Sequence, residues 1–175
     1  NLSLKNYTKI RIKKAKEMVE RYSREQMAQK WNTQAKYGAW LEVEKAAVKA
    51  WNKLGFISDA DCEKICKNAK FEVARIDEIE KTTKHDVIAF LTSVSESLGE
   101  ESRFVHYGMT SSDCIDTAVA LQMKESLELI ISDVEEFMQA VKNRANEHKH
   151  TLMVGRSHGI HGEPITFGLV LAVWY

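Results

Sequence analysis

Apolar residues recur three or four positions apart through most of the sequence, which predicts α-helices. Ser23 and Ser58 stand at positions suited to helix N-caps, and Gly55 stands where the first long stripe ends. Gly99 ends the last stripe of this region, and we expect residues 100–111 to form a loop. We interpret the tryptophans of these stripes as core residues. The four apolar stripes are Met27 and Trp31; Trp40, Val43, Ala47, Trp51 and Leu54; Cys62, Ile65, Ala69, Ile76 and Ile79; and Val87, Leu91, Val94 and Leu98.

The strongest helical pattern begins near Ser112 or Asp113 and continues to about His148. A helix of that length would be roughly 50 Å long at 1.5 Å per residue. Its apolar residues alternate four and three apart, as in a coiled-coil heptad; they are Met123, Leu127, Ile130, Val134, Phe137 and Val141. So long a stripe needs equally long partners, and this chain holds too few of them. We therefore expect further chain or sister subunits to cover it.

These patterns predict an all-α fold in three parts. Residues 1–17 form a leader or disordered extension, residues 18–111 a smaller N-terminal helical domain, and residues 112–175 the first part of a long helical bundle. No segment with strand periodicity stands out. Pro164, the only proline, is expected to initiate a last helix within the apolar segment that ends the sequence.

The basic leader admits two interpretations. It carries Lys and Arg residues with no acid before Glu17, as in an arm that binds nucleic acid or phosphate. Aromatic residues hardly interleave with these charges, however, and Met18 is a natural start. We therefore interpret the leader as an extension outside the fold.

Composition narrows the function classes. The 25 basic and 25 acidic residues give a formal net charge of zero, so no global field attracts nucleic acid or an acidic membrane. No apolar run is long enough to span a bilayer, and no signal peptide is evident. The odd cysteine count, with Cys62 and Cys66 one helical turn apart and Cys114 alone, indicates reduced thiols in a cytoplasmic protein.

The most informative stretch is residues 155–164, Gly-Arg-Ser-His-Gly-Ile-His-Gly-Glu-Pro. Its glycines forbid a regular helix and allow tight turns. Histidine is the natural proton carrier at neutral pH, and the glycine setting favours a functional role for His158 or His161. We choose His158, although spacing alone does not separate the two. The alternative is that both merely form hydrogen bonds in a buried corner.

Three further clusters could meet an anionic ligand. Lys84-His85-Asp86, at a break between two stripes, could bind an anion or simply start a helix with an acid in its first turn. The hydroxyls of Thr110, Ser111 and Ser112, followed by Asp113, precede the long helix, whose free amides suit a carboxylate or phosphate. Ordinary capping explains one of these residues but not all. A guanidinium beside a phenol, Arg21-Tyr22, could grip a phosphate.

Together these clusters resemble the adenylosuccinate lyase family within the fumarase and aspartase superfamily. The motifs that carry the resemblance, over about residues 18–175, are Glu20-Arg21-Tyr22-Ser23, Lys84-His85-Asp86-Val87, His106-Tyr107-Gly108-Met109-Thr110-Ser111-Ser112-Asp113 and Gly155-Arg156-Ser157-His158-Gly159. The Thr-Ser-Ser-Asp motif is shared across the superfamily. The Arg-Tyr pair and the His-Asp cluster favour the nucleotide member.

The resemblance implies a β-elimination that releases fumarate, with His158 as general acid and His85 in a supporting role. It implies that Arg21 and Tyr22 meet the nucleotide and that Lys84, His85 and Asp86 line the substrate site. The remaining binding residues that it implies are Thr110 and Ser111, at the succinyl portion, and Ser157. Lys84 stands where arginine is common in the family, so it keeps the charge but loses the bidentate fork.

The resemblance further implies no cofactor and no metal, a nucleotide as the small-molecule substrate, and a homotetramer whose active sites are built from three chains. The catalytic base of the family is a serine on a later loop that these 175 residues do not include.

Three alternatives stay open. The first is another lyase of the superfamily, acting on a different succinyl or muconate substrate. The second is a non-catalytic helical assembly module, because a heptad seam alone indicates only assembly. The third is a metal-binding bundle using Glu147, His150, His158 and His161, although di-iron bundles need two Glu-x-x-His motifs and only one is present.

We predict that these 175 residues alone have no lyase activity, because the base and the other bundle helices lie outside them. The purified chain is mixed with adenylosuccinate, and fumarate is followed by its ultraviolet absorbance. Robust fumarate release would contradict the prediction.

Overall fold

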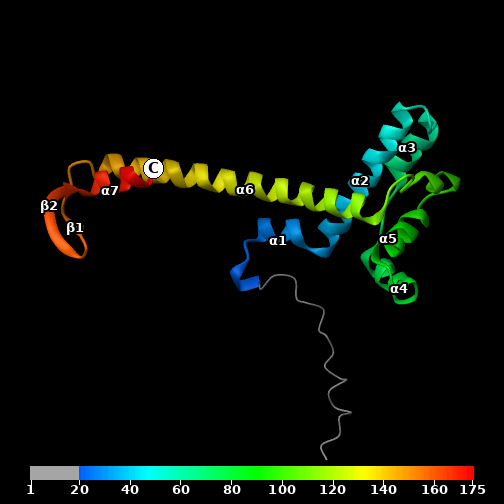
Figure 1. The fold of residues 1–175 in the computed structure, drawn as a ribbon, viewed down its shortest axis with the longest axis horizontal. Helices are drawn as coiled ribbons and strands as arrows, with labels where there is room; N and C mark the ends of the chain where they lie inside the picture. Colours follow the sequence, from blue (N-terminus) through cyan, green and yellow to red (C-terminus); the bar gives the residue numbers. More distant parts are fainter. Residues whose placement is uncertain (1–19) are drawn as a thin grey trace, which may run out of the picture. The chain divides into compact units, whose positions relative to one another are not determined.

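The computed structural model describes residues 20–175, so the predicted leader lies outside the described residues. The chain divides into two compact units, one ending at Ser126 and the other formed by Leu127–Tyr175. In the first unit the elements before α6 are η2 (Glu20–Tyr22), α1 (Glu25–Trp31), α2 (Thr33–Lys53), α3 (Asp59–Asn68), α4 (Val73–Thr83), α5 (Asp86–Ser95) and η3 (Glu100–Phe104) (Figure 1). The long helix α6 (Ser111–Glu147) has residues in both units, and β1 (Leu152–Ser157), β2 (Ile160–Thr166) and α7 (Phe167–Trp174) complete the second. The predicted helical class and the predicted long helix are confirmed.

Local signals predicted several helix ends correctly. Helix α2 ends at Lys53, and Gly55 follows with the positive φ of 79° that favours glycine. The hydroxyl of Ser58 accepts a hydrogen bond from the Asp61 amide at 3.1 Å, as an N-cap does. The first helix differs, because Arg24 rather than Ser23 precedes α1, and Asn32 then interrupts the stripe and caps α2.

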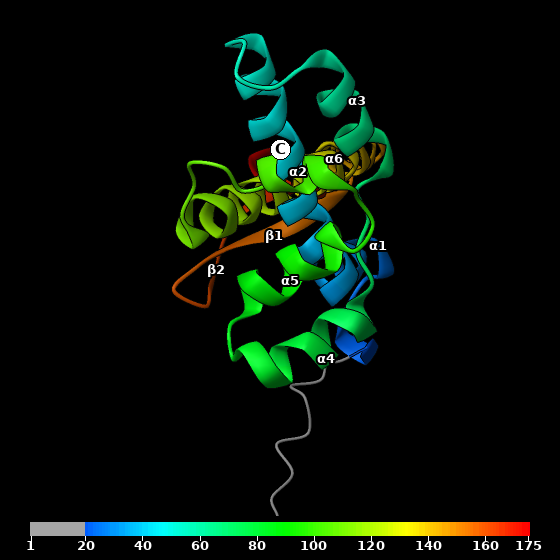
Figure 2. The ribbon, with the colours of Figure 1, turned by 90° about the vertical axis from the view of Figure 1, so that its right-hand side faces the viewer.

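A second interruption separates α3 from α4, which the apolar stripe had joined. The segment between them is extended, and two hydroxyls of the α5 region hold its backbone. Ser93 accepts from the Glu72 amide at 3.3 Å, and Ser97 accepts from the Lys70 amide at 3.1 Å. Helices α4 and α5 consequently lie side by side in both views (Figure 1 and Figure 2).

Aromatic side chains form the centre of the first unit. Trp40 on α2 and Phe90 on α5 are fully buried, and their rings meet edge to face with centroids 5.4 Å apart. Tyr37 stacks on Phe90 at 5.7 Å. Burying each such ring stabilises the fold by roughly 1.5–3 kcal/mol. Not every tryptophan is core, since Trp31 is 41% exposed and donates its indole N–H to Ser126.

The second unit contains a β-hairpin that the sequence analysis did not predict. Strands β1 and β2 pair antiparallel, and Pro164 lies opposite Val154 in β2 instead of starting a helix. His158 and Gly159 form the two-residue connection, with φ values of 51° and 76° typical of a type I′ turn. The last helix begins only at Phe167, where Thr166 is the N-cap and accepts from the Leu169 amide.

The apolar seam of α6 is largely uncovered. Leu127, Ile130, Val134 and Phe137 are each about half exposed, whereas Val141 is buried. Aliphatic and aromatic groups at heptad spacing favour burial against another helix. The seam therefore presents an apolar face that other chain segments could cover. None of the described helices is both long and apolar enough to cross a lipid bilayer.

We predict that Gly168→Ala destabilises the second unit. A Cβ at this position would lie 2.5 Å from the Ala145 carbonyl oxygen and 2.8 Å from that of His148. Because both neighbours are backbone atoms, relieving the clash should cost about 1–3 kcal/mol of unfolding free energy, measured by urea titration.

Gly38→Ala is the matched control. Gly38 lies inside α2, and a Cβ there would have no atom within 4 Å. It should therefore stabilise the helix by roughly 0.5–1 kcal/mol. Equal effects of the two substitutions would refute the packing argument.

Candidate functional site

Lys84, His85 and Asp86 form the junction between α4 and α5. Lys84 ends α4 in the left-handed conformation with φ 53°, and His85 is the N-cap of α5. The His85 Nδ1 accepts from the Ile88 amide at 3.4 Å, and the Asp86 carboxylate accepts from the Val87 amide at 2.8 Å. The helix-start interpretation is thus confirmed. The side chains of His85 and Asp86 remain 43% and 41% exposed, so both can still reach a ligand.

The cap also sets the tautomer of His85. Because Nδ1 accepts a backbone hydrogen bond, the neutral ring carries its proton on Nε2. The exposed edge of the ring is then a hydrogen-bond donor. The nearest oxygen of Asp86 lies 3.7 Å from Nδ1, beyond hydrogen-bonding distance.

At the start of α6, the backbone of Thr110 and the side chain of Asp113 satisfy each other. The Thr110 amide donates to the Asp113 carboxylate at 2.8 Å, and the Asp113 amide donates to the Thr110 carbonyl at 3.0 Å. Capping therefore accounts for Asp113. Among the described residues, no intrachain hydrogen bond engages the hydroxyls of Thr110 and Ser111. A helix N-terminus with two uncommitted hydroxyls suits an anionic group.

His158 and Ser157 lie at the tip of the hairpin in the second unit. Ser157 is the last residue of β1, and His158 occupies the first position of the turn. Both are exposed, as is His161 on β2. The interpretation that the two histidines form hydrogen bonds in a buried corner is wrong for this chain. The imidazole of His158 is exposed, and within residues 20–175 no hydrogen bond or ion pair engages it.

Arg21 and Tyr22 lie in η2 at the beginning of the described chain. The Arg21 guanidinium stands 4.8 Å from the centroid of the Tyr22 ring, a cation–π contact, and Tyr22 is 78% exposed. The pair is accessible.

The candidate residues stay in separate local groups. In residues 20–175, no hydrogen bond or ion pair joins the His85 group to the Thr110 group, and the His158 group belongs to the other unit. Each group nevertheless lies exposed at the end of a helix or strand. This position is typical of residues that bind ligands.

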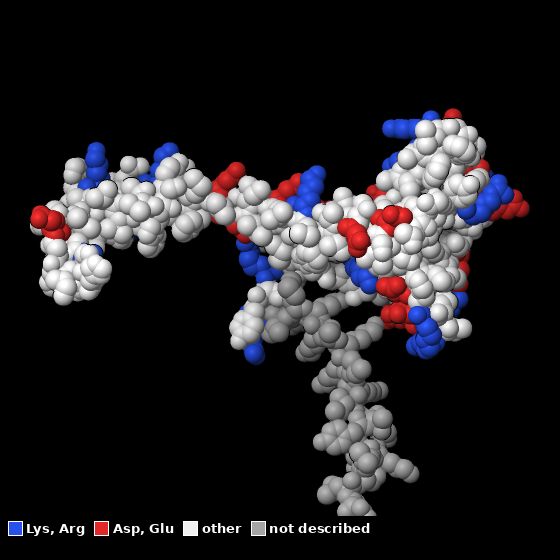
Figure 3. All heavy atoms as spheres, viewed as in Figure 1, with Lys and Arg blue, Asp and Glu red and all other residues white. Residues whose placement is uncertain are grey.

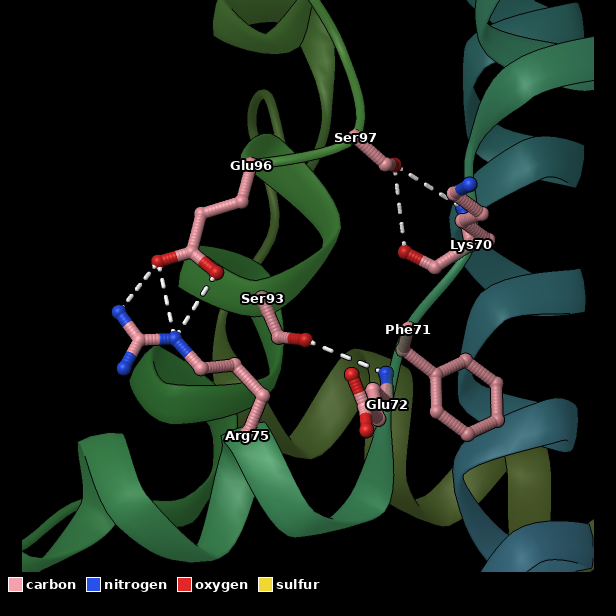
Figure 4. Close-up of a pocket in the computed structure, with 7 residues that line it drawn as sticks. All are labelled: Lys70, Phe71, Glu72, Arg75, Ser93, Glu96 and Ser97. Atoms are coloured by element: carbon pink, nitrogen blue, oxygen red, sulfur yellow. Dashed lines mark hydrogen bonds and ion pairs between the residues drawn. The ribbon is translucent and has the colours of Figure 1, made fainter.

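A surface pocket of about 420 Å³ lies elsewhere in the first unit (Figure 4). Arg75 and Glu96 line it and form a two-pronged ion pair, with the closest contact at 2.7 Å. Glu96 and Glu78 raise the pKa of Arg75, and the Arg75 guanidinium lowers the pKa of Glu96. None of the predicted site residues lines this pocket, and its Arg75 and Glu96 already pair with each other.

Charge and metal-ligand patterns give no competing site. Basic and acidic groups are interspersed over the part formed by α3, α4 and α5, without a single-sign face in this view (Figure 3). Over the described part of the chain, no three His, Cys, Asp or Glu side chains are grouped so that they could hold a metal ion. The metal-binding bundle therefore finds no ligand cluster there.

Sequence reasoning missed one buried carboxylate, that of Glu44 on α2, which is only 1% exposed. Its position offered a signal, because Tyr37, Trp40, Leu41 and Val48 occupy the same face of the helix at spacings of three and four. An acid on such a face needs polar partners inside the fold.

Comparison with known proteins places the chain in one family. Residues 15–175 match a protein family described as lyase, and the chain belongs to that family. Over 157 residues it is 67% identical to the adenylosuccinate lyase of Helicobacter pylori (strain ATCC 700392 / 26695), and over 158 residues it is 52% identical to that of Staphylococcus saprophyticus subsp. saprophyticus. Each alignment covers 90% of this chain. These relatives confirm the resemblance to adenylosuccinate lyase.

The chain spans little more than a third of its relatives' length, 36% and 37% of these two. Among solved structures, a fumarate lyase from Mesorhizobium sp. BNC1 has a TM-score of 0.78 at 29% identity, covering 85% of this chain and 36% of that one. A 3-carboxy-cis,cis-muconate lactonizing enzyme from Pseudomonas putida has a TM-score of 0.70 at 25% identity, covering 84% and 35%. These structures confirm the helical fold class.

We predict that Cys114, in the first turn of α6, resists alkylation in the folded protein. Burial raises the pKa of Cys114 to about 12, with Glu44 adding to the shift. A thiol whose pKa is raised this far stays protonated at pH 8, and only the thiolate is a strong nucleophile. Iodoacetamide labelling at pH 8, followed by peptide mass spectrometry, should modify the half-buried Cys66 first and Cys114 only after unfolding in urea. Equal labelling of both in the folded state would contradict this.

Proposed function

We propose that the protein acts as an adenylosuccinate lyase. The reaction would be β-elimination of fumarate from adenylosuccinate, giving AMP, and from the succinylaminoimidazole carboxamide ribotide, giving the aminoimidazole carboxamide ribotide. The observation that carries the proposal is the 67% identity to a curated adenylosuccinate lyase across 90% of this chain. The motifs around His85, Thr110 and His158 all fall within residues 15–175, the range of the family match.

His158 is proposed as the general acid that protonates the departing nitrogen. A base removes a proton from the carbon beside a carboxylate, and the carbon–nitrogen bond then breaks as the leaving nitrogen takes a proton. Support comes from the exposed position of His158 at the hairpin tip and from the ability of an imidazole to carry a proton. Positioned general acids are generally worth roughly 10²–10⁴ in rate.

The anionic substrate is proposed to contact four exposed groups. Thr110 and Ser111 would hold the succinyl portion, where hydroxyls adjoin the positive end of the long helix α6. Lys84, His85 and Asp86 would line the site, with the His85 Nε2–H as a donor. Ser157 would assist beside His158, and Arg21 with Tyr22 would meet the nucleotide. Lys84 supplies charge without the bidentate geometry of arginine.

The complete site is proposed to need other chains. The resemblance supplies a homotetramer whose sites combine three subunits and a catalytic serine outside these residues. The half-exposed seam from Leu127 to Phe137 supports assembly, since an apolar helix face of this length favours burial against other helices. A cytoplasmic location is part of the same proposal.

Another lyase activity is the second candidate. Its support is the structural likeness to the Pseudomonas putida muconate lactonizing enzyme. Because identity is 25% to that enzyme and 67% to the adenylosuccinate lyase, the nucleotide substrate is favoured. Incubating the protein at its natural length with adenylosuccinate, with loss of the purine chromophore as the readout, separates the two candidates.

We predict that His158→Gln lowers kcat by about 10²–10⁴, because glutamine cannot deliver a proton to the leaving nitrogen. The protein at its natural length is assayed with adenylosuccinate at saturating concentration. KM should change much less than kcat.

His161→Gln on the same hairpin is the matched control, since that side chain is also exposed. It should retain kcat within a few-fold. Loss of activity in the His161 variant with full activity in the His158 variant would reverse the assignment. No turnover of adenylosuccinate by the wild type would refute the proposed function itself.

A further inference from the structure

The carboxylate of Glu44 is buried in the centre of the first unit. It lies in the middle of α2 with a relative exposure of 1%, on the face that also buries Trp40 and Val48. Removing a carboxylate from water is strongly unfavourable unless polar partners replace the lost hydration. The polar partners of Glu44 therefore indicate the role of this carboxylate.

Each oxygen of Glu44 accepts a hydrogen bond from His106. The His106 backbone amide donates to Oε2 at 2.8 Å, and the His106 ring donates from Nδ1 to Oε1 at 2.6 Å. His106 adopts a left-handed conformation with φ 65°, which is unfavourable for a residue other than glycine. The two hydrogen bonds offset the cost of this conformation, and they determine where the chain turns toward α6.

Cys114 gives Glu44 a second contact, on the far side of the loop. Its thiol is fully buried in the first turn of α6 and donates to the Trp40 carbonyl at 3.7 Å, and the nearby Glu44 helps to raise its pKa. Both Glu44 and Trp40 belong to α2. The start of α6 is therefore held against the same helix that holds His106.

These contacts bracket the segment that carries Thr110 and Ser111. His106 precedes the two hydroxyl residues and is held by Glu44, and Cys114 follows them and is held by the Trp40 carbonyl beside Glu44. Trp51, also on α2, adds a hydrogen bond from its indole to the Tyr107 carbonyl at 2.9 Å. Within the described part of the chain, no hydrogen bond engages the hydroxyls of Thr110 and Ser111.

We propose that Glu44 is a positioning residue that fixes residues 106–114 so that the hydroxyls of Thr110 and Ser111 face the substrate's succinyl group. The inference rests on the proposed function, because it presumes that these hydroxyls bind substrate. A purely structural role would be served as well by an apolar side chain of similar size, which is often neutral or stabilising in place of a buried charge. Glu44 instead directs both oxygens at a strained residue outside its own helix.

Glu44→Met is the decisive variant. Methionine keeps the length and most of the volume of glutamate but removes both acceptor oxygens. In the protein at its natural length we expect kcat/KM for adenylosuccinate to fall roughly tenfold to a hundredfold, mainly through a higher KM, as displaced binding groups generally cause. Glu44→Gln should recover most of this loss. The glutamine side-chain oxygen can accept from the His106 backbone N–H, and its NH₂ group can donate to Nδ1 when the His106 ring carries its proton on Nε2.

Ile76→Ala is the control for loss of stability. Ile76 is fully buried on α4 and has no hydrogen bond to the loop, so its truncation should lower Tm without raising KM. If Ile76→Ala raises KM as much as Glu44→Met, the effect comes from general destabilisation and the proposal is overturned. A rise in KM below threefold for Glu44→Met overturns it as well.

Amide hydrogen exchange separates this proposal from the proposed function. Glu44→Met should raise exchange at least tenfold in residues 106–114 and leave α3 unchanged, whatever the substrate is. If the wild type fails to turn over adenylosuccinate, the proposed function is refuted, while exchange still tests whether Glu44 fixes residues 106–114. If the wild type is active but Glu44→Met shows unaltered exchange, only the positioning role of Glu44 is refuted. Should Glu44→Met not fold, Glu44→Asp, too short to reach both His106 atoms, carries the same threefold criterion.

Discussion

The edge-to-face contact between Trp40 and Phe90 is the interaction on which the first unit depends. It joins α2 to α5 through two fully buried rings, with Tyr37 stacked beside them. Helix α5 begins at the His85 cap, and α2 carries the carboxylate and the carbonyl that hold the loop before α6. Two of the groups proposed to meet the substrate in this unit, those at His85 and Thr110, are therefore located relative to one aromatic centre.

The candidate groups combine a structural task with accessibility. His85 uses Nδ1 to cap a helix and keeps Nε2 for a ligand, and Asp113 satisfies the Thr110 amide while the neighbouring hydroxyls stay unengaged. The capping hydrogen bonds thus fix the orientation of the His85 and Asp113 side chains, while the neighbouring groups proposed to face the ligand stay accessible. His158 belongs to the second unit and these groups to the first, and the proposed site also draws on other chains.

Sequence reasoning succeeded where the controlling interaction is local. Gly55 and Ser58 mark helix ends through contacts within three residues, so the pattern alone located them. The break between α3 and α4 depends on Ser93 and Ser97, more than twenty residues away, and the contact of Glu44 with His106 spans 62 residues. The hairpin was not predicted because both of its faces are mostly exposed, so its strands lack the apolar alternation that indicates a strand. The exposed position of His158 also depends on that hairpin.

The hairpin has a consequence for handling the chain in solution. Within the described residues it is a ribbon of only two strands, so each strand pairs on one side alone and offers backbone amides and carbonyls on the other. Leu152 and Ile160 add exposed apolar surface along it. Open, apolar β-edges recruit further strands from neighbouring molecules. The hairpin is thus a second surface prone to self-association at high concentration, beside the apolar seam of α6.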